Sequence, residues 1–178
     1  MHKTQKSIQA DLITKILLIS YLLILIWILL FKFGVQFSYM SERNINLSPF
    51  REFYTSAENV DPPQIILNIL IFVPLGLYVG ILLPKLHFFI KTALFFLVSF
   101  FIELFQYILK IGAFDITDII NNTAGGILGF LILKFLILIF GTRSKAQKVV
   151  NWLGILGTTL MLLLLVLLNL NMLPIRYQ

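Results

Sequence analysis

The stretch "FFIELFQYIL" (residues 100–109) places a glutamate and a glutamine inside an apolar run that is otherwise typical of a membrane-spanning helix. A charged side chain at mid-bilayer costs about 2.5–3.5 kcal/mol on scales derived from helix insertion, so a lone carboxylate is unfavourable there. The whole run covers residues 88–109, which is long enough to cross ~30 Å of hydrocarbon at ~1.5 Å per residue. We therefore expect a membrane helix in which polar groups from other segments meet Glu103.

The rest of the chain has the composition of an integral membrane protein. Of its 178 residues, 59% are hydrophobic and 12% are charged, which leaves too few polar side chains to cover a water-soluble domain. The apolar residues form long runs, so we predict an all-α polytopic membrane protein in which residues 1–178 make a single transmembrane domain. We interpret the first run as a retained N-terminal anchor and the last as an apolar, lipid-facing helix. The five predicted spans are residues 13–31, 65–83, 88–109, 119–141 and 152–171.

The composition also excludes several kinds of chemistry. The chain has no cysteine, and therefore no disulfide, thiolate metal site or cysteine nucleophile. The net charge is +6, but no basic patch interleaved with aromatic residues is present, so we expect no nucleic-acid partner. We interpret the basic residues as signals of membrane topology instead.

Five spans place the two termini on opposite sides of the membrane, and lysine and arginine are unequally divided between those sides. Cytoplasmic segments carry the excess of these residues in membrane proteins. The N-terminal side would hold Lys3, Lys6, Lys15, Lys85, Lys91, Lys134, Arg143, Lys145 and Lys148, whereas the other side would hold Lys32, Arg43, Arg51, Lys110 and Arg176. We therefore predict a cytoplasmic N-terminus and an extracytoplasmic C-terminus.

Polar residues of three predicted spans gather on the predicted extracytoplasmic side. Glu103 lies in the last third of an outward-running span, and Gln106 follows three residues later on the same helix face. The next span enters from that side through "GAFDITDIINNTAGGILG" (residues 112–129), and the second span also begins there. The candidate ligand-binding residues are Asn68, Glu103, Gln106, Asp115, Asp118 and Asn122.

Most members of this cluster also have a structural interpretation. Asp115 is suited to cap the fourth span, and Asp118 would then lie favourably in its first turn. The asparagines could join helices by hydrogen bonds, and we interpret Gly125, Gly126 and Gly129 as positions of close helix packing. Glu103 is different, because it lies away from any helix end and has no lysine or arginine three or four residues away. Ionisable residues inside a membrane are candidates for function by default.

The residues in this order resemble a known family. The segments "NILIFVPLG" (68–76), "IELFQ" (102–106) and "FDITDIINNTAGGILG" (114–129), at these intervals, resemble the VanZ-like family of bacterial membrane proteins. The upstream "NINLSPF" (44–50) is similar to a stretch that precedes the second helix in many members, so the resemblance covers about residues 44–133. It implies a multi-pass protein of the bacterial cell membrane and a link to resistance against glycopeptides such as teicoplanin, without implying a particular reaction.

Three hypotheses remain for the cluster. In the first, it binds or shields the headgroup of a lipid-linked cell-wall precursor or a lipoglycopeptide, and the loop 32–64, with its arginines and aromatic residues, covers it at the interface. In the second, Glu103, Asp115 and Asp118 are catalytic or metal-binding carboxylates that act on a lipid-linked substrate. In the third, the cluster is only structural, and the protein is a helix-packing partner of another membrane protein.

The first hypothesis is preferred. The two histidines, His2 and His87, fall on the predicted cytoplasmic side, and no serine or cysteine nucleophile motif is present. No cofactor is evident, although a divalent cation such as Mg²⁺ or Mn²⁺ would suit a carboxylate site. Whether the chain is an enzyme stays open at this point.

The predicted topology can be tested by cysteine labelling, since the chain has no cysteine of its own. In whole cells, a membrane-impermeant thiol reagent should label Ser41→Cys and Thr117→Cys, because both positions lie on the predicted outer side. Ser7→Cys and Ser144→Cys should be labelled only after permeabilisation. The reverse pattern would place the polar cluster in the cytoplasm.

Overall fold

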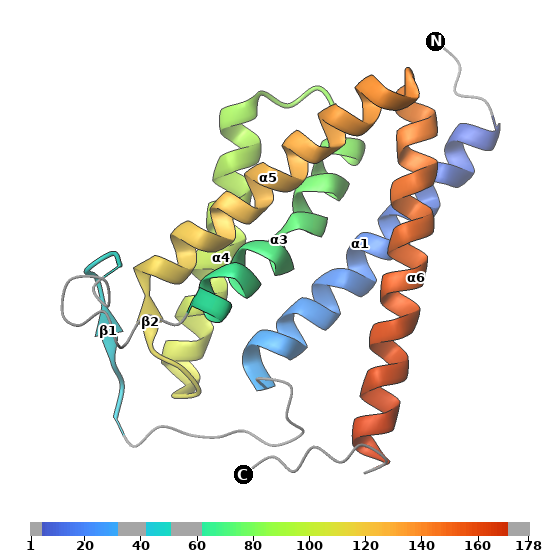
Figure 1. The fold of residues 1–178 in the computed structure, drawn as a ribbon. Helices are drawn as coiled ribbons and strands as arrows, with labels where there is room; N and C mark the ends of the chain where they lie inside the picture. Colours follow the sequence, from blue (N-terminus) through green and yellow to red (C-terminus); the bar gives the residue numbers. More distant parts are fainter. Residues whose placement is uncertain (1–4, 32–41, 51–61, 171–178) are drawn as a thin grey trace.

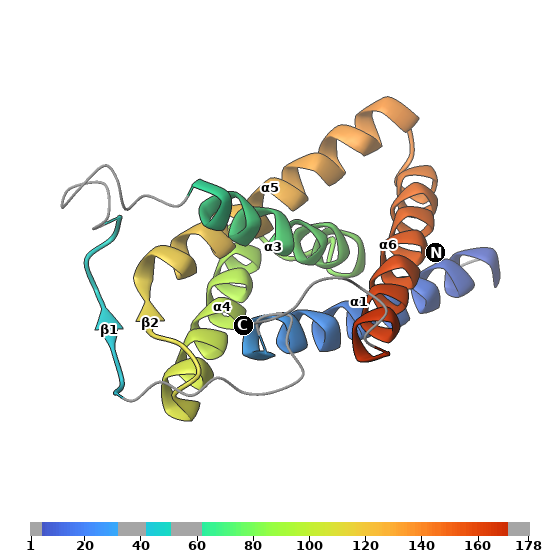
Figure 2. The same ribbon diagram turned by 60° about the horizontal axis from the view of Figure 1, so that its bottom comes forward.

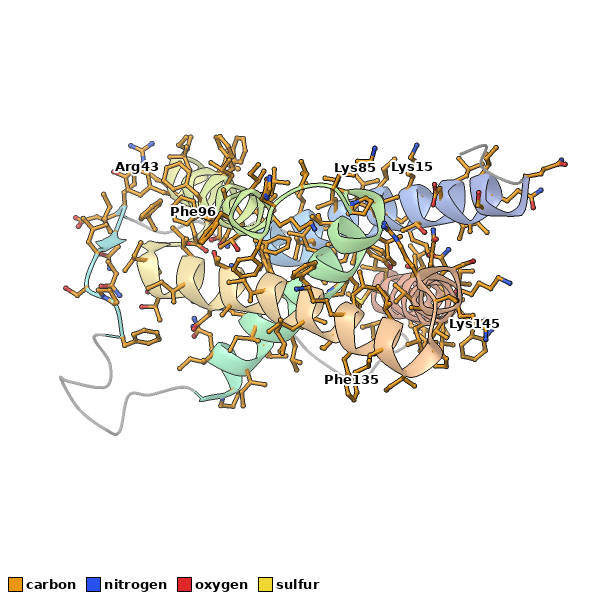
Figure 3. The ribbon with its side chains drawn as sticks, turned by 90° about the horizontal axis from the view of Figure 1, so that it is seen from above. Lys15, Arg43, Lys85, Phe96, Phe135 and Lys145 are labelled. Carbon is orange, nitrogen blue, oxygen red and sulfur yellow. The ribbon has the colours of Figure 1, made fainter. Side chains whose placement is uncertain are left out.

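The computed structural model describes residues 5–31, 42–50 and 62–170, which form five long helices and two very short strands (Figure 1). All five helices are long and apolar enough to cross a membrane, which confirms the predicted all-α polytopic class. Large apolar side chains are exposed on the bundle, as lipid-facing residues are; Phe135, for example, projects outward from α5 (Figure 3). The elements are α1 (Gln5–Phe31), β1 (Ile45–Asn46), α3 (Pro62–Leu82), α4 (Phe88–Leu109), β2 (Phe114–Asp115), α5 (Ile116–Phe140) and α6 (Arg143–Asn169).

Successive helices alternate in direction, so the bundle has two distinct ends (Figure 1). The two strands lie at one end, together with the connection between α4 and α5; we call this the strand end, residues 42–50 and 110–118. The short turns between α3 and α4 and between α5 and α6 lie at the other; we call this the turn end, residues 83–87 and 141–142. The predicted topology assigns the strand end to the outer side of the membrane.

The closest contact in the bundle joins α3 and α5, backbone to backbone. A Cβ atom added to Gly125 would lie 2.1 Å from the carbonyl oxygen of Ile69, and one added to Gly129 would lie 2.0 Å from that of Val73. On α3, a Cβ atom at Gly76 would lie 2.0 Å from the carbonyl oxygen of Gly126. Small residues four apart allow this approach in membranes, where no water is expelled to drive helices together. The interpretation of the α5 glycines as packing positions is confirmed.

Helix α4 packs on the same glycine-rich part of α5. Phe95 is fully buried, and its ring carbon Cγ would lie 2.5 Å from a Cβ atom at Gly126. Phe72 and Leu75 of α3 and Leu25 of α1 belong to the same buried apolar cluster. This cluster joins α3, α4 and α5 to α1 in the middle part of the bundle.

Helices α1 and α6 begin earlier than the apolar runs 13–31 and 152–171, and polar side chains in the second and third turns of the two helices pair with each other. The Thr14 hydroxyl donates to Asn151 Oδ1 at 2.8 Å, and Gln147 Nε2 donates to Thr14 Oγ1 at 2.9 Å. Gln147 Nε2 also lies 3.0 Å from Asp11 Oδ1. Hydrogen bonds between these helices satisfy side chains that would otherwise be too polar for a span.

The glycine contact leads to a stability prediction. Gly129→Ala should lower the thermal unfolding midpoint of the detergent-solubilised protein, because the new methyl group forces α3 and α5 apart; overpacking of this kind costs about 1–3 kcal/mol. The matched control is Gly157→Ala on α6, where an added Cβ atom meets nothing within 4 Å. The control should be neutral or slightly stabilising, and an equal response of the two variants would contradict the packing account.

Candidate functional site

The start of α5 is built around Asp115. Its backbone is extended (φ −121°, ψ 119°), and its Oδ1 atom accepts a hydrogen bond of 2.7 Å from the amide of Thr117, so Asp115 is the N-cap of the helix. Asp118 follows in the first turn, where a negative charge interacts favourably with the helix dipole. The capping role that the sequence indicated is therefore confirmed.

The segment before α3 reaches this N-cap by strand pairing. β1 and β2 run parallel, with Ile45 opposite Phe114 and Asn46 opposite Asp115 (Figure 2). The Asn46 side chain donates from Nδ2 to Asp115 Oδ2 at 3.0 Å, while its own Oδ1 accepts from the amide of Ser48 at 3.2 Å. Both oxygens of the Asp115 carboxylate thus accept hydrogen bonds from N–H groups.

Glu103 of α4 contacts the same segment. A polar partner was expected for it, because it lies within an apolar helix. Its side chain is 3% exposed, and Oε2 accepts a hydrogen bond of 3.2 Å from the backbone amide of Asp115. A buried carboxylate is tolerated where it accepts such bonds. Glu103 therefore ties the last turns of α4 to the start of α5, and Asn46 continues the chain of contacts into the loop segment 42–50.

Helix α3 contributes Asn68. Its Nδ2 atom donates to Asp118 Oδ1 at 2.6 Å, which joins α3 to the first turn of α5. Asn68 directly precedes Ile69, whose carbonyl oxygen packs against Gly125. The glycine contact between α3 and α5 thus sets the position of this hydrogen bond.

One turn deeper along α5, two consecutive residues, Asn121 and Asn122, are both buried. Asn122 is 1% exposed and donates from Nδ2 to the Ser99 hydroxyl of α4 at 2.9 Å. The Oδ1 atom of Asn122 and the Nδ2 atom of Asn121 have no hydrogen-bond partner within the described ranges. Buried polar atoms without a partner are rare in folded proteins. The inner part of the cluster therefore has one donor, Asn121 Nδ2, and one acceptor, Asn122 Oδ1, without a described partner.

Gln106 was expected to join the cluster because it shares a helix face with Glu103, but its described hydrogen bond goes to α1 instead. Its Nε2 atom donates to the carbonyl oxygen of Leu29 at 2.8 Å, so it joins α4 to the end of α1. The contacts of the other five candidates run between α3, α4, α5 and the 42–50 segment. Gln106 borders the cluster beside Glu103 and connects it to α1.

Part of the predicted cover over the cluster is described. The Phe50 amide donates to Thr117 Oγ1 at 3.1 Å, and Arg43 donates to the carbonyl oxygen of Ile108 at 3.3 Å, with its guanidinium 5.7 Å from the Tyr107 ring centroid. Residues 42–50 therefore lie over the ends of α4 and α5. The remaining residues predicted to form this cover, Phe37, Tyr39, Arg51, Phe53 and Tyr54, lie outside the described residues.

Sequence reasoning missed four polar members, Asn46, Ser99, Thr117 and Asn121. Ser99 precedes Glu103 by one helical turn, so a search for polar residues at that spacing would have found it. Asn46 stands in the quoted "NINLSPF" segment, but nothing in the sequence pairs it with Asp115. No group of three acidic or histidine side chains arranged to hold a metal ion occurs in the described part of the chain.

Comparisons with known proteins agree with this arrangement of motifs. The profile of the VanZ/LLP1 family matches residues 18–140. Protein VanZ of Enterococcus faecium is 37% identical over 151 residues, which cover 82% of this chain and 88% of that protein. No solved structure matches. With most of both chains aligned and the family profile extending over four of the five helices, the chain belongs to the VanZ/LLP1 family of multi-pass bacterial membrane proteins.

Proposed function

We propose that the polar cluster at the strand end binds the headgroup of an outer-leaflet lipid or lipid-linked cell-wall precursor, and that by occupying or shielding this group the protein reduces susceptibility to lipoglycopeptides such as teicoplanin. The observation that carries the proposal is the buried carboxylate of Glu103, which accepts from the Asp115 amide beneath the 42–50 segment. Around it, three helices and a loop contribute polar groups at one end of an otherwise apolar bundle.

The inner asparagines support a binding role over a purely structural one. A cluster that only packs helices gains from pairing all of its buried donors and acceptors, since an unpaired one costs about 1–3 kcal/mol. The Nδ2 atom of Asn121 and the Oδ1 atom of Asn122 are unpaired among the described residues. Hydroxyl, phosphate and amide groups of a glycan or phosphate headgroup offer complementary acceptors and donors.

The enzymatic alternative, with Glu103, Asp115 and Asp118 around a divalent cation, has less support. A cation site needs carboxylate oxygens directed at a common point. Here both oxygens of Asp115 accept from N–H groups, and Asp118 Oδ1 accepts from Asn68. These carboxylates are oriented by amide donors, as expected where they position a binding surface.

The functional test is a pair of matched substitutions. Glu103→Gln should reach the membrane at the wild-type level, because the glutamine oxygen can still accept from the Asp115 amide, and yet should lose protection. Glu42→Gln makes the same chemical change at an exposed position of the strand end, and this variant should retain protection. The measurement is the teicoplanin inhibitory concentration of a sensitive Gram-positive host that expresses each variant, with membrane levels compared by immunoblot.

Three further outcomes separate the alternatives. Full protection by Glu103→Gln would contradict the proposal. Unchanged function of Glu103→Leu would favour the structural role, because leucine removes the polar group altogether. Loss of activity of the purified protein in EDTA, with rescue by Mg²⁺, would favour the enzymatic alternative.

A further inference from the structure

Basic side chains converge on one aromatic ring at the turn end, opposite the polar cluster. Phe130 of α5 is 7% exposed and lies against α3, where a Cβ atom at Gly80 would be 3.2 Å from its ring. The Lys91 ammonium of α4 lies 4.5 Å from the centroid of this ring, and the Lys134 ammonium of α5 lies 4.8 Å from it. Two positive charges from two helices thus share a single phenyl group.

A third cation stands beside them. Arg143, the first residue of α6, donates from one guanidinium nitrogen to the carbonyl oxygens of Gly80 and Ile81. These carbonyls belong to the last turn of α3, whose negative dipole end favours a cation. The two carbonyl oxygens thus accept from Arg143. They carry no net charge, so they do not neutralise the two lysines.

The two lysines have no acidic counterpart in the described residues. Lys91 is only 3% exposed, its described favourable side-chain contact is with the ring, and its described charged neighbours are the cations Arg143 and Lys134. Four described acids lie in α4, β2, α5 and the loop at the strand end: Glu42, Glu103, Asp115 and Asp118. The fifth, Asp11 of α1, accepts from Gln147 and interacts electrostatically with Arg143, and among the described contacts it is not a partner of either lysine. Contact with an aromatic face contributes about 0.5–2 kcal/mol but neutralises no charge. A buried ammonium beside a second one therefore calls for an external anion.

The location indicates what that anion is. Lys91 is the fourth residue of its span and Arg143 is the first residue of its own, so both lie where a span meets the lipid headgroups. The N-cap residue of α4, His87, makes no side-chain capping bond. The first-turn amides of α4, which begins at the same end of the bundle, are therefore available to an anion as well. Basic groups between transmembrane helices at the cytoplasmic side are suited to anionic lipid headgroups.

We propose that Lys91, Lys134 and Arg143 form a binding site for the phosphate group of an anionic phospholipid in the leaflet at the turn end. The phosphate neutralises the two ammonium groups on Phe130 and joins α4, α5 and the start of α6. This site lies at the opposite end of the bundle from Glu103, and it does not rest on the proposed function of that cluster. In the predicted topology the lipid belongs to the cytoplasmic leaflet.

The test compares thermal unfolding of the full chain in nanodiscs of phosphatidylcholine with and without phosphatidylglycerol. Wild type should unfold at a higher temperature when phosphatidylglycerol is present. The rise should be lost in the double variant Lys91→Met/Lys134→Gln, and each single change should weaken phosphatidylglycerol binding about fivefold, which corresponds to ~1 kcal/mol for one basic residue near a lipid surface. Lys148→Gln, an exposed lysine of α6, is the matched control and should keep the rise.

Folding and the source of the phosphate are controlled in the same experiment. Lys91→Met should be at least as stable as wild type in phosphatidylcholine alone, because it removes a buried charge that has no anionic partner there, and methionine can still pack on the Phe130 ring. Inorganic phosphate added to phosphatidylcholine nanodiscs should produce no rise; a rise equal to that with phosphatidylglycerol would overturn the assignment to lipid. A full rise in the double variant would overturn the site itself.

Discussion

The backbone contact between α3 and α5 is the constraint on which the rest of the structure depends. Gly125 and Gly129 lie against the carbonyl oxygens of Ile69 and Val73 so closely that no side chain fits between the helices. In a bilayer, apolar surface gives little preference for one helix neighbour over another, so close packing of small residues has to select the partner. Once this pair is in register, Asn68 reaches Asp118, and Phe95 of α4 closes over Gly126.

The polar chemistry of the chain is then divided between the two ends of the bundle. At the strand end, carboxylates of Glu103, Asp115 and Asp118 accept hydrogen bonds from amide groups of α3, α5 and the 42–50 segment. At the turn end, Lys91 and Lys134 meet on Phe130. Lys91 and Lys134 are among the basic residues that the topology prediction assigned to the cytoplasmic side. This separation gives each face of the membrane a chemically different surface.

Much of this arrangement could be predicted from the sequence, because long apolar runs determine the spans and a glutamate within one of them needs a polar partner. The five spans, the α5 glycine packing and the Asp115 cap all followed from such rules. The β1–β2 pair could not be predicted, since two residues are too few for any alternation of side chains.

Other features escaped sequence reasoning for a similar reason. The pairing of α1 with α6 depends on Thr14, Gln147 and Asn151. In the sequence, Gln147 and Asn151 stand outside the apolar run 152–171, and nothing there pairs them with Thr14. The Gln106 bond to Leu29 depends on a backbone carbonyl, which every residue has, so no sequence signal identifies it. These pairings become visible only when the helices are placed relative to one another in three dimensions.

The most direct measurement of the central claim is the set of envelope lipids that copurify with the protein. Wild type and Glu103→Gln would be extracted from a Gram-positive host in the same mild detergent and analysed by native mass spectrometry. The account predicts that wild type retains an outer-leaflet lipid or lipid-linked precursor that Glu103→Gln loses, while both variants keep the same fold and membrane level. The same lipids bound to both in equal amounts would contradict the claim that the Glu103 cluster is a headgroup-binding site.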